Sequence, residues 1–151
     1  MSADVDVTVE IDPEEAVDLV AEMERAGFKL RIRDVEGFVA ATRVLPFLDL
    51  ATELPLDVVL AGPGLEELFL ERARDVEISG TTISVISPED LIVTKILAGR
   101  SKDLDDVRGI LNERGERLDL DQIRETLDLL EQALGQSDLR PQFEAELRRA
   151  E

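Results

Sequence analysis

Three aspartates on two predicted strands have the residue type and the spacing of a cation site. Polar and apolar residues alternate over residues 4–11, and a period of two is typical of a half-buried β-strand. Asp4 and Asp6 therefore share one face of that strand. Aspartate is unfavourable in strands, so two carboxylates on one face need a nearby positive charge. Asp57 is the one charged residue in the apolar, β-like run 56–61, which a neighbouring strand would place beside them. Three carboxylates that meet across two strands would bind Mg²⁺, or two ions if a substrate phosphate bridges them.

A simpler interpretation of the same residues stays open. Asp4 and Asp6 could form a solvated strand face or a ragged amino terminus, because the whole chain is rich in acids. An unpaired carboxylate inside an apolar strand is costly, so Asp57 must be ion-paired, metal-bound or at an exposed strand end. The aspartates alone do not decide between these interpretations.

The elements that must position the aspartates alternate between strand and helix. Asp12 and Pro13 begin a predicted helix that ends at Gly27, with a capping carboxylate, a proline in the first turn and a glycine stop. Residues 28–33 alternate again and predict a second strand. Residues 34–42 predict a short helix or an irregular turn.

The rest of the first half adds strands of a different kind. Residues 43–50 are β-like, but Pro46 cannot donate to a ladder and indicates an edge position or a bulge. Residues 65–74 predict a helix, and residues 76–86 predict a hairpin that turns near Gly80. Strands that alternate with helices but include a hairpin predict a mixed α+β or α/β sheet.

The second half is predicted to be helical. Ser87 and Pro88 begin a helix that ends at Gly99, with a serine cap followed by proline. Further helices are predicted over residues 104–114, 121–134 and 141–150. The apolar residues of the 121–134 helix recur at helical spacing, so this helix either packs on the domain or mediates dimerisation.

The composition limits the classes of function. The chain has 151 residues, 17 basic and 35 acidic, with a net charge of -18, which disfavours a broad nucleic-acid-binding face, so any contact with RNA or DNA needs a local basic patch or a metal. No run of residues is long enough to cross a bilayer, no export leader opens the chain and no Cys is present. We therefore expect a soluble, cytoplasmic protein without a membrane partner.

A second cluster of charges follows the Ser87 cap. Lysine is rare, at positions 29, 95 and 102 only, and two of these lysines fall within residues 87–107. Together with the aspartates at 4, 6 and 57, this stretch resembles the minimal nucleotidyltransferases of the DNA polymerase β superfamily. The likeness is greatest to the branch that includes AbiEii-type toxins and related small bacterial proteins. It covers most of residues 3–111, and the last two helices carry none of it.

The resemblance implies both a fold and a division of the chain. The implied core is a mixed sheet of about four or five strands backed by helices, with a nucleoside triphosphate and Mg²⁺ at its mouth. The implied domains are a nucleotidyltransferase-like part, residues 1–114, and a helical appendage, residues 115–151, that packs on it or on a partner.

The resemblance also implies roles for individual residues. Asp4 and Asp6 match the metal-binding pair, and Asp57 matches the third carboxylate, which helps to bind one of two ions and acts as base toward an incoming hydroxyl. Nucleotidyl transfer depends on positioning and on cations that neutralise phosphate charge, which is what these residues would supply.

The basic cluster has an implied role and an ordinary one. Lys95 matches a phosphate-contacting lysine, with Arg100 and Lys102 as helpers and Asp103 as the acid that follows. Alternatively, the cations complement the end of their helix and pair with Asp103 and the acids that follow it. For Arg100 the two interpretations are equally good, whereas for Lys95 we favour the phosphate contact.

Three functions follow as hypotheses. The first is a Mg²⁺-dependent nucleotidyltransferase that acts on a hydroxyl of RNA such as tRNA, of protein or of a small molecule, within a toxin–antitoxin system. The superfamily usually has a Gly-Ser or Gly-Gly turn before the first carboxylates, but this chain opens on residues 1–3, Met-Ser-Ala. Either the native protein is longer at its amino terminus, or part of the nucleotide site is lost. For the latter case, the second hypothesis is a non-catalytic protein with the same fold, partner-binding or regulatory, with an antitoxin or a second copy as its partner. The third, a metal-dependent nuclease, is disfavoured because the chain has no His or Tyr and is acidic.

Overall fold

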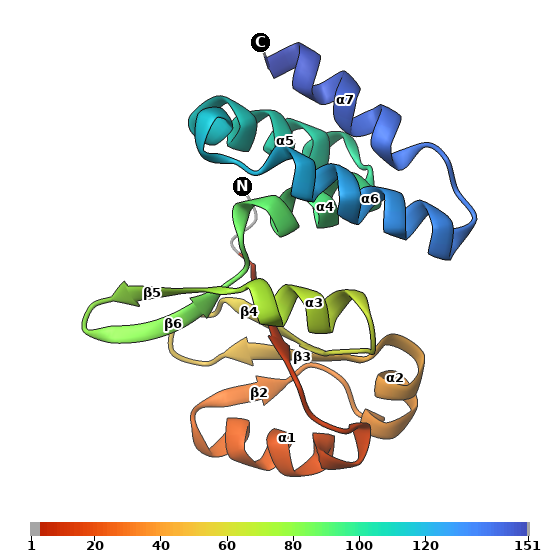
Figure 1. Ribbon diagram of the computed structural model, residues 1–151. Helices are drawn as coiled ribbons and strands as arrows, with labels where there is room; N and C mark the ends of the chain where they lie inside the picture. Colours follow the sequence, from red (N-terminus) through yellow and green to blue (C-terminus); the bar gives the residue numbers. More distant parts are fainter. Residues whose placement is uncertain (1–3, 151) are drawn as a thin grey trace. The chain divides into compact units, whose positions relative to one another are not determined.

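The computed structural model describes residues 4–150 of the chain, and Figure 1 shows its elements. The strands are β1 (Val5–Val9), β2 (Phe28–Leu30), β3 (Val44–Asp49), β4 (Pro55–Leu60), β5 (Arg74–Ile78) and β6 (Thr81–Val85). The α-helices are α1 (Ala16–Arg25), α2 (Val35–Thr42), α3 (Leu65–Arg72), α4 (Pro88–Ala98), α5 (Ser101–Arg114), α6 (Leu120–Leu134) and α7 (Leu139–Ala150). Two short 3₁₀ helices are η1 (Pro13–Glu15) and η2 (Gly115–Arg117). The predicted α+β class is confirmed.

The chain forms two compact units, Met1–Glu71 and Arg72–Glu151. The division predicted from the sequence, residues 1–114 and 115–151, stays a prediction. Residues 1–3, where the Gly-Ser turn would be expected, lie outside the described residues.

The first unit is built on a mixed sheet of order β1-β4-β3-β2. β1 runs parallel to β4, and the other pairs are antiparallel. Helices α1 and α2 cover one face, because their apolar side chains share a core with alternate residues of β3 and β4. The buried core residues are Ala16, Val39, Leu45, Phe47, Val58 and Leu60.

Pro46 lies in an interior strand, contrary to the prediction of an edge strand or a bulge. β3 pairs with β2 on one side and β4 on the other. The carbonyl of Pro46 accepts from the amide of Arg31 at 2.8 Å, so the ring nitrogen of Pro46 also points toward β2. β2 ends at Leu30, so the missing donor falls where the ladder stops. The proline therefore has an edge position within a strand that is interior overall.

The second unit begins with the predicted hairpin. β5 and β6 pair only with each other in the described part of the chain, as Figure 1 shows. Ser79 and Gly80 have φ angles of 52° and 81°, and two positive φ angles in a row are typical of a two-residue type I′ turn. The hairpin prediction is confirmed, although its strands form a separate sheet.

Helices α4 to α7 pack on one another to form the rest of the second unit. The Ser87 side chain caps α4 by accepting from the amide of Asp90, and Gly99 ends α4 with a φ of 66°. Ile123 and Leu127 of α6 are fully buried, and α6 packs on α4 and α7. One face of α6 therefore packs on helices of its own chain. Within residues 4–150, no helix is both long and apolar enough to cross a membrane.

Candidate functional site

The sheet register brings two of the three predicted carboxylates together. Asp6 on β1 is the direct partner of Asp57 on β4, and direct partners project their side chains to the same face of a sheet. That face is opposite the core, because the residues on either side of Asp57, Leu56 and Val58, belong to the core cluster. Asp4 lies two residues before Asp6 and shares its face. The side-by-side placement predicted for residues 6 and 57 is therefore present in the first unit.

Asp57 is ion-paired. The Nη2 of Arg31 donates to its Oδ1 at 2.5 Å, while the Nε of Arg31 donates to the carbonyl of Phe47 at 3.2 Å. The two side chains are 40% and 38% exposed, so solvent reaches both of them. Pro46, Asp57 and Asp6 thus form one row across β3, β4 and β1, and Arg31, directly after β2, reaches over the proline to the acid.

The paired carboxylates are too few to hold a metal ion by themselves. Among residues 4–150, no group of three or more acidic, His or Cys side chains is close enough to hold a metal ion. Mg²⁺ commonly binds through only one or two carboxylates and takes its other ligands from water and substrate phosphates. The oxygen donors of Asp6 and Asp57 fit that pattern, whereas a site made of protein ligands alone is absent from this part of the chain.

The predicted basic cluster is an ion-pair network in the second unit. The Nζ of Lys95 donates to Asp106 at 2.8 Å and to Asp103 at 3.5 Å. Arg100 donates two hydrogen bonds to Asp103, from Nε at 2.6 Å and from Nη2 at 3.2 Å. Asp103 is 1% exposed, and its burial beside two cations fixes the end of α4 against the start of α5. Lys102 is exposed.

The network shifts the acid–base properties of its members. The Arg100 guanidinium, with help from Lys95, holds the pKa of Asp103 below its ordinary value despite burial. The hydrogen bond to Asp106 raises the pKa of Lys95. Lys95 is therefore a permanent cation at neutral pH, suited to binding a phosphate and unsuited to acting as a base.

Two more acids are buried at the start of α4, and the sequence did not reveal them. Asp90 is fully buried and accepts from Arg72 at 3.1 Å, while its second oxygen has no partner in the described structure. Glu89 accepts from Arg74 at 3.1 Å and from the amide of Asp119 at 3.2 Å. Both tie the beginning of the second unit to α4.

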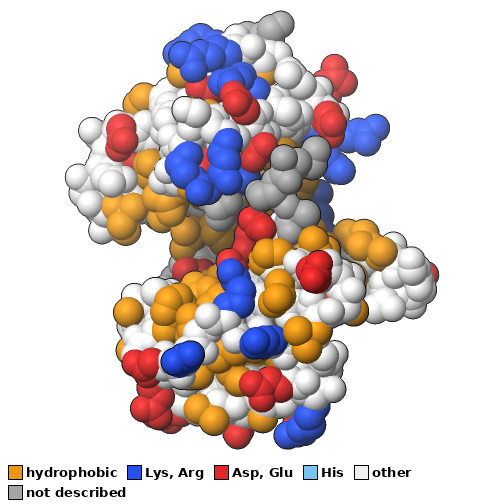
Figure 2. Space-filling model, turned by 180° about the vertical axis from the view of Figure 1, so that it is seen from behind, with side chains coloured by type: hydrophobic (Ala, Val, Ile, Leu, Met, Phe, Trp, Pro, Cys, Tyr) orange, Lys and Arg blue, Asp and Glu red, His pale blue; other side chains and the backbone are white. Residues whose placement is uncertain are grey.

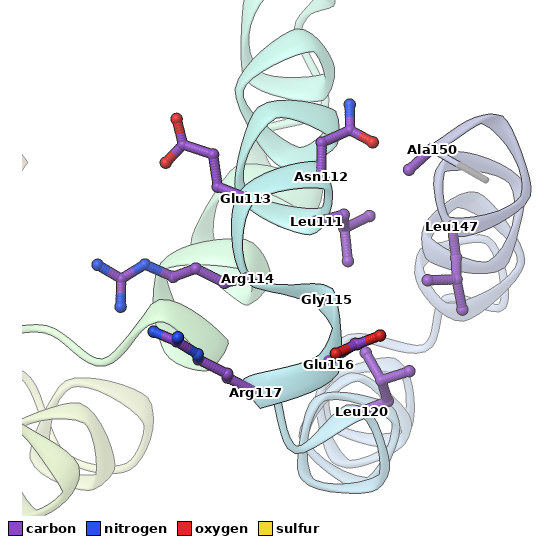
Figure 3. Close-up of a pocket in the computed structure, with 10 residues that line it drawn as sticks. All are labelled: Leu111, Asn112, Glu113, Arg114, Gly115, Glu116, Arg117, Leu120, Leu147 and Ala150. Atoms are coloured by element: carbon purple, nitrogen blue, oxygen red, sulfur yellow. The ribbon is translucent and has the colours of Figure 1, made fainter.

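A groove of about 830 Å³ in the second unit contains none of the predicted site residues. It lies where α5 ends, between η2 and α7 (Figure 3). Figure 3 shows Arg114 and Arg117 pointing to one side of η2, away from Leu147 and Ala150. The groove holds both acids and cations and no convergent set of ligands.

Arg31 is the functional candidate that sequence reasoning missed. In the sequence analysis, the alternation over residues 28–33 serves only to predict a strand. The same pattern places Lys29, Arg31 and Arg33 together on the opposite face, and the structure joins that face to Asp57 through Arg31. The sequence signal that could have identified Arg31 is that one predicted strand has a basic face and another has an acidic face.

The comparison with known proteins bears mainly on the second unit. Residues 62–137 match the family described as nucleotidyl transferase of unknown function (DUF2204), which is half of the chain. The matched segment contains Lys95, Arg100, Lys102 and Asp103 and begins after Asp57. No curated protein matches the chain. On this match, together with the α+β fold, the chain belongs to this family of nucleotidyl transferases.

Proposed function

We propose that the protein is a Mg²⁺-dependent nucleotidyltransferase, which moves a nucleoside monophosphate from a nucleoside triphosphate to a hydroxyl group and releases pyrophosphate. Membership of the family supports the reaction class. The observation that carries the proposal is the register of the first unit, which pairs Asp6 with Asp57 on the face opposite the core. Adjacent carboxylates on an exposed sheet face are suited to a hard cation and its phosphate ligands.

In this proposal the three aspartates have distinct roles. Asp6 and Asp57 hold Mg²⁺ from adjacent strands, and Asp4 adds an oxygen from the same face. When bound, the ions neutralise charge that develops on the phosphate oxygens. Asp57 accepts the proton of the attacking hydroxyl, which requires its carboxylate to exchange the Arg31 contact for a contact with the acceptor.

Lys95 is the proposed phosphate contact of the second unit. Its side chain is 27% exposed, so the ammonium can reach a ligand without leaving its helix. The buried Asp103 holds Lys95 and Arg100 in place, while the contact with Asp106, whose side chain is 53% exposed, is the one a phosphate would replace. Lys102 and Arg100 add positive charge beside it. Asp103 is thus a positioning residue in this scheme.

The finer assignment follows the resemblance seen in the sequence. We place the protein in the DNA polymerase β superfamily, near the AbiEii-type toxins, with tRNA or a protein as acceptor. An antitoxin, or a second copy of the chain, would be its binding partner. This placement predicts that transfer needs Mg²⁺ and that the acceptor is a macromolecule.

The test is transfer of label from each common nucleoside triphosphate to bulk tRNA or protein, with and without Mg²⁺. Asp57→Asn should abolish transfer, because it removes both a ligand and the base. Asp75→Asn is the matched control, since it makes the same charge change at an exposed residue of β5. Lys95→Met should lower transfer strongly while preserving Mg²⁺ binding. Transfer that survives Asp57→Asn, or no transfer with any triphosphate, would refute the proposal.

One observation favours a second candidate, a non-catalytic protein of the same fold. Asp57 and Lys95 are both engaged in ion pairs within their own units, as they would be if their roles were structural. Calorimetry with Mg²⁺ and a triphosphate separates the two candidates. Saturable binding that Asp57→Asn abolishes supports the enzyme, and its absence supports the non-catalytic protein.

A further inference from the structure

A groove of about 370 Å³ runs along the β2 edge of the first unit. Its lining residues are Lys29, Leu30, Arg31, Ile32, Arg33 and Leu48. Three of the 17 basic residues of an acidic chain therefore fall within five positions and line one groove. Figure 2 shows Lys and Arg side chains set among hydrophobic ones on the part of the molecule that holds the four-stranded sheet.

Pro46 explains why the groove exists. A residue with a backbone N–H at this position would form a second hydrogen bond with Arg31 and continue the β2 ladder. Proline has none, so β2 stops at Leu30 and the next residues leave the sheet. The segment from Arg31 to Arg33 thus becomes a wall of the groove, at the open edge of the sheet.

Two of the three basic side chains of the groove form no ion pair in the described part of the chain. Arg31 is the one member of the trio with a carboxylate partner in the described part of the chain. Lys29 and Arg33 are exposed and form no ion pair among residues 4–150. In a molecule with a net charge of -18, cations left without acids are the places where an anion can still bind.

We propose that Lys29, Arg31 and Arg33 bind the phosphate backbone of a single-stranded RNA, the acceptor of the transfer reaction. The assignment of this RNA as acceptor rests on the proposed function. The link is Arg31, which lines the groove and donates to Asp57, the proposed base, at 2.5 Å. An RNA strand held by the trio would therefore lie beside the carboxylate that must reach its hydroxyl.

The spacing and chemistry of the trio favour a nucleic acid over an acidic protein. The chain bends at Arg31 and Arg33, so the trio spans less than the roughly 14 Å of a fully extended segment. A stacked single strand carries one charge per 3.4 Å or so, so three phosphates lie within that distance. Arginine also binds phosphate oxygens in a bidentate manner. The aromatic residues near the groove, Phe28 and Phe47, pack in the core, so binding should depend on the backbone and be independent of sequence.

The test measures fluorescence anisotropy of a labelled single-stranded RNA of about 12 nucleotides, without triphosphate, over a range of salt concentrations. Wild-type protein should bind with a slope of log K against log salt of about -2, as expected for three phosphate contacts. Lys29→Ala/Arg33→Ala should weaken binding by about tenfold or more at low salt and reduce the slope by about 1.4. Arg114→Ala/Arg117→Ala removes the same charge from exposed residues of the second unit and should bind like wild type.

Several results would overturn the inference. The wild-type protein could show no saturable RNA binding, the control variant could lose as much RNA affinity as Lys29→Ala/Arg33→Ala, or an acidic peptide of equal charge could displace the RNA. Edge strands also use charged residues to prevent pairing with other chains. If that is the role of the trio, the Lys29→Ala/Arg33→Ala variant will associate with itself and still bind RNA like wild type. RNA binding without any transfer activity would refute the proposed function and leave the groove assignment standing, whereas transfer that is unaffected by Lys29→Ala/Arg33→Ala would refute the groove as the acceptor site.

Discussion

The Arg31–Asp57 ion pair provides a direct test of the metal site. If Asp57 is a Mg²⁺ ligand, the guanidinium of Arg31 competes with the ion for the same carboxylate. Arg31→Met keeps much of the side-chain volume and removes the competitor. We therefore predict that Arg31→Met binds Mg²⁺ more tightly than wild type.

The structure sets the size of this effect. The paired side chains are 40% and 38% exposed, and exposed ion pairs contribute about 0.2–1 kcal/mol. Since 1.4 kcal/mol or so corresponds to a factor of ten, the gain in affinity should be at most about fivefold. A larger gain would mean that the pair is less solvated than its exposure indicates.

The assay is a titration of free protein with Mg²⁺ by calorimetry, or with Mn²⁺ by electron paramagnetic resonance. Arg25→Met is the matched control, because it removes an arginine of the same unit whose ion pair with Glu22 is 70% and 68% exposed. Arg25→Met should leave the affinity unchanged, and Asp57→Asn should abolish binding in either background. Unchanged or weaker binding by Arg31→Met would refute the assignment of Asp57 as a ligand.

Three further predictions concern stability and local structure. Asp103 and Glu144 have pKa values below their ordinary values of 3.8 and 4.5, owing first to Arg100 and Arg124. A carboxyl group whose pKa is lowered in the folded state stabilises the fold at pH values above its ordinary pKa, so the free energy of unfolding should fall as the pH drops below about 4.5. Asp103→Asn should reduce this pH dependence in urea titrations, whereas Asp75→Asn should not. Arg72→Met leaves the fully buried Asp90 without its cation and should lower the free energy of unfolding by about 3 kcal/mol. Adding Asp90→Asn to Arg72→Met should recover most of that loss. If the losses of stability from the two substitutions simply add, the ion-pair role is contradicted. Pro46→Val supplies the missing donor to Arg31 and should extend β2 by one hydrogen bond, detected as a slowly exchanging amide at residue 46; fast exchange there would contradict the account of how the groove forms.

Local patterns predicted most of the secondary structure. The alternation in residues 4–11 predicted β1, the apolar run 56–61 predicted β4, Ser87 and Pro88 predicted the start of α4, and Gly80 predicted the hairpin turn. These features depend on neighbouring residues alone, through side-chain periodicity, capping and backbone dihedral preference. The shared face of Asp4 and Asp6 follows from the same periodicity.

The pairing of elements could not be derived in that way. Sequence alone did not show that β3 would be an interior strand or that Pro46 would lie where the pairing of β3 with β2 ends. It also did not show that Asp57 would meet Arg31. The burial of Asp90 with Arg72 was equally hidden, because both residues have ordinary local explanations.

The sequence by itself therefore determined on which face of their strands the charged residues lie. Only the tertiary structure decided which of them meet: Asp6 with Asp57, Asp57 with Arg31, and Lys95 with Asp103 and Asp106. The physical reason is that a strand or helix pattern is set by contacts a few residues apart, whereas register and ion pairing depend on segments that are distant in the chain and come together only when the core is buried.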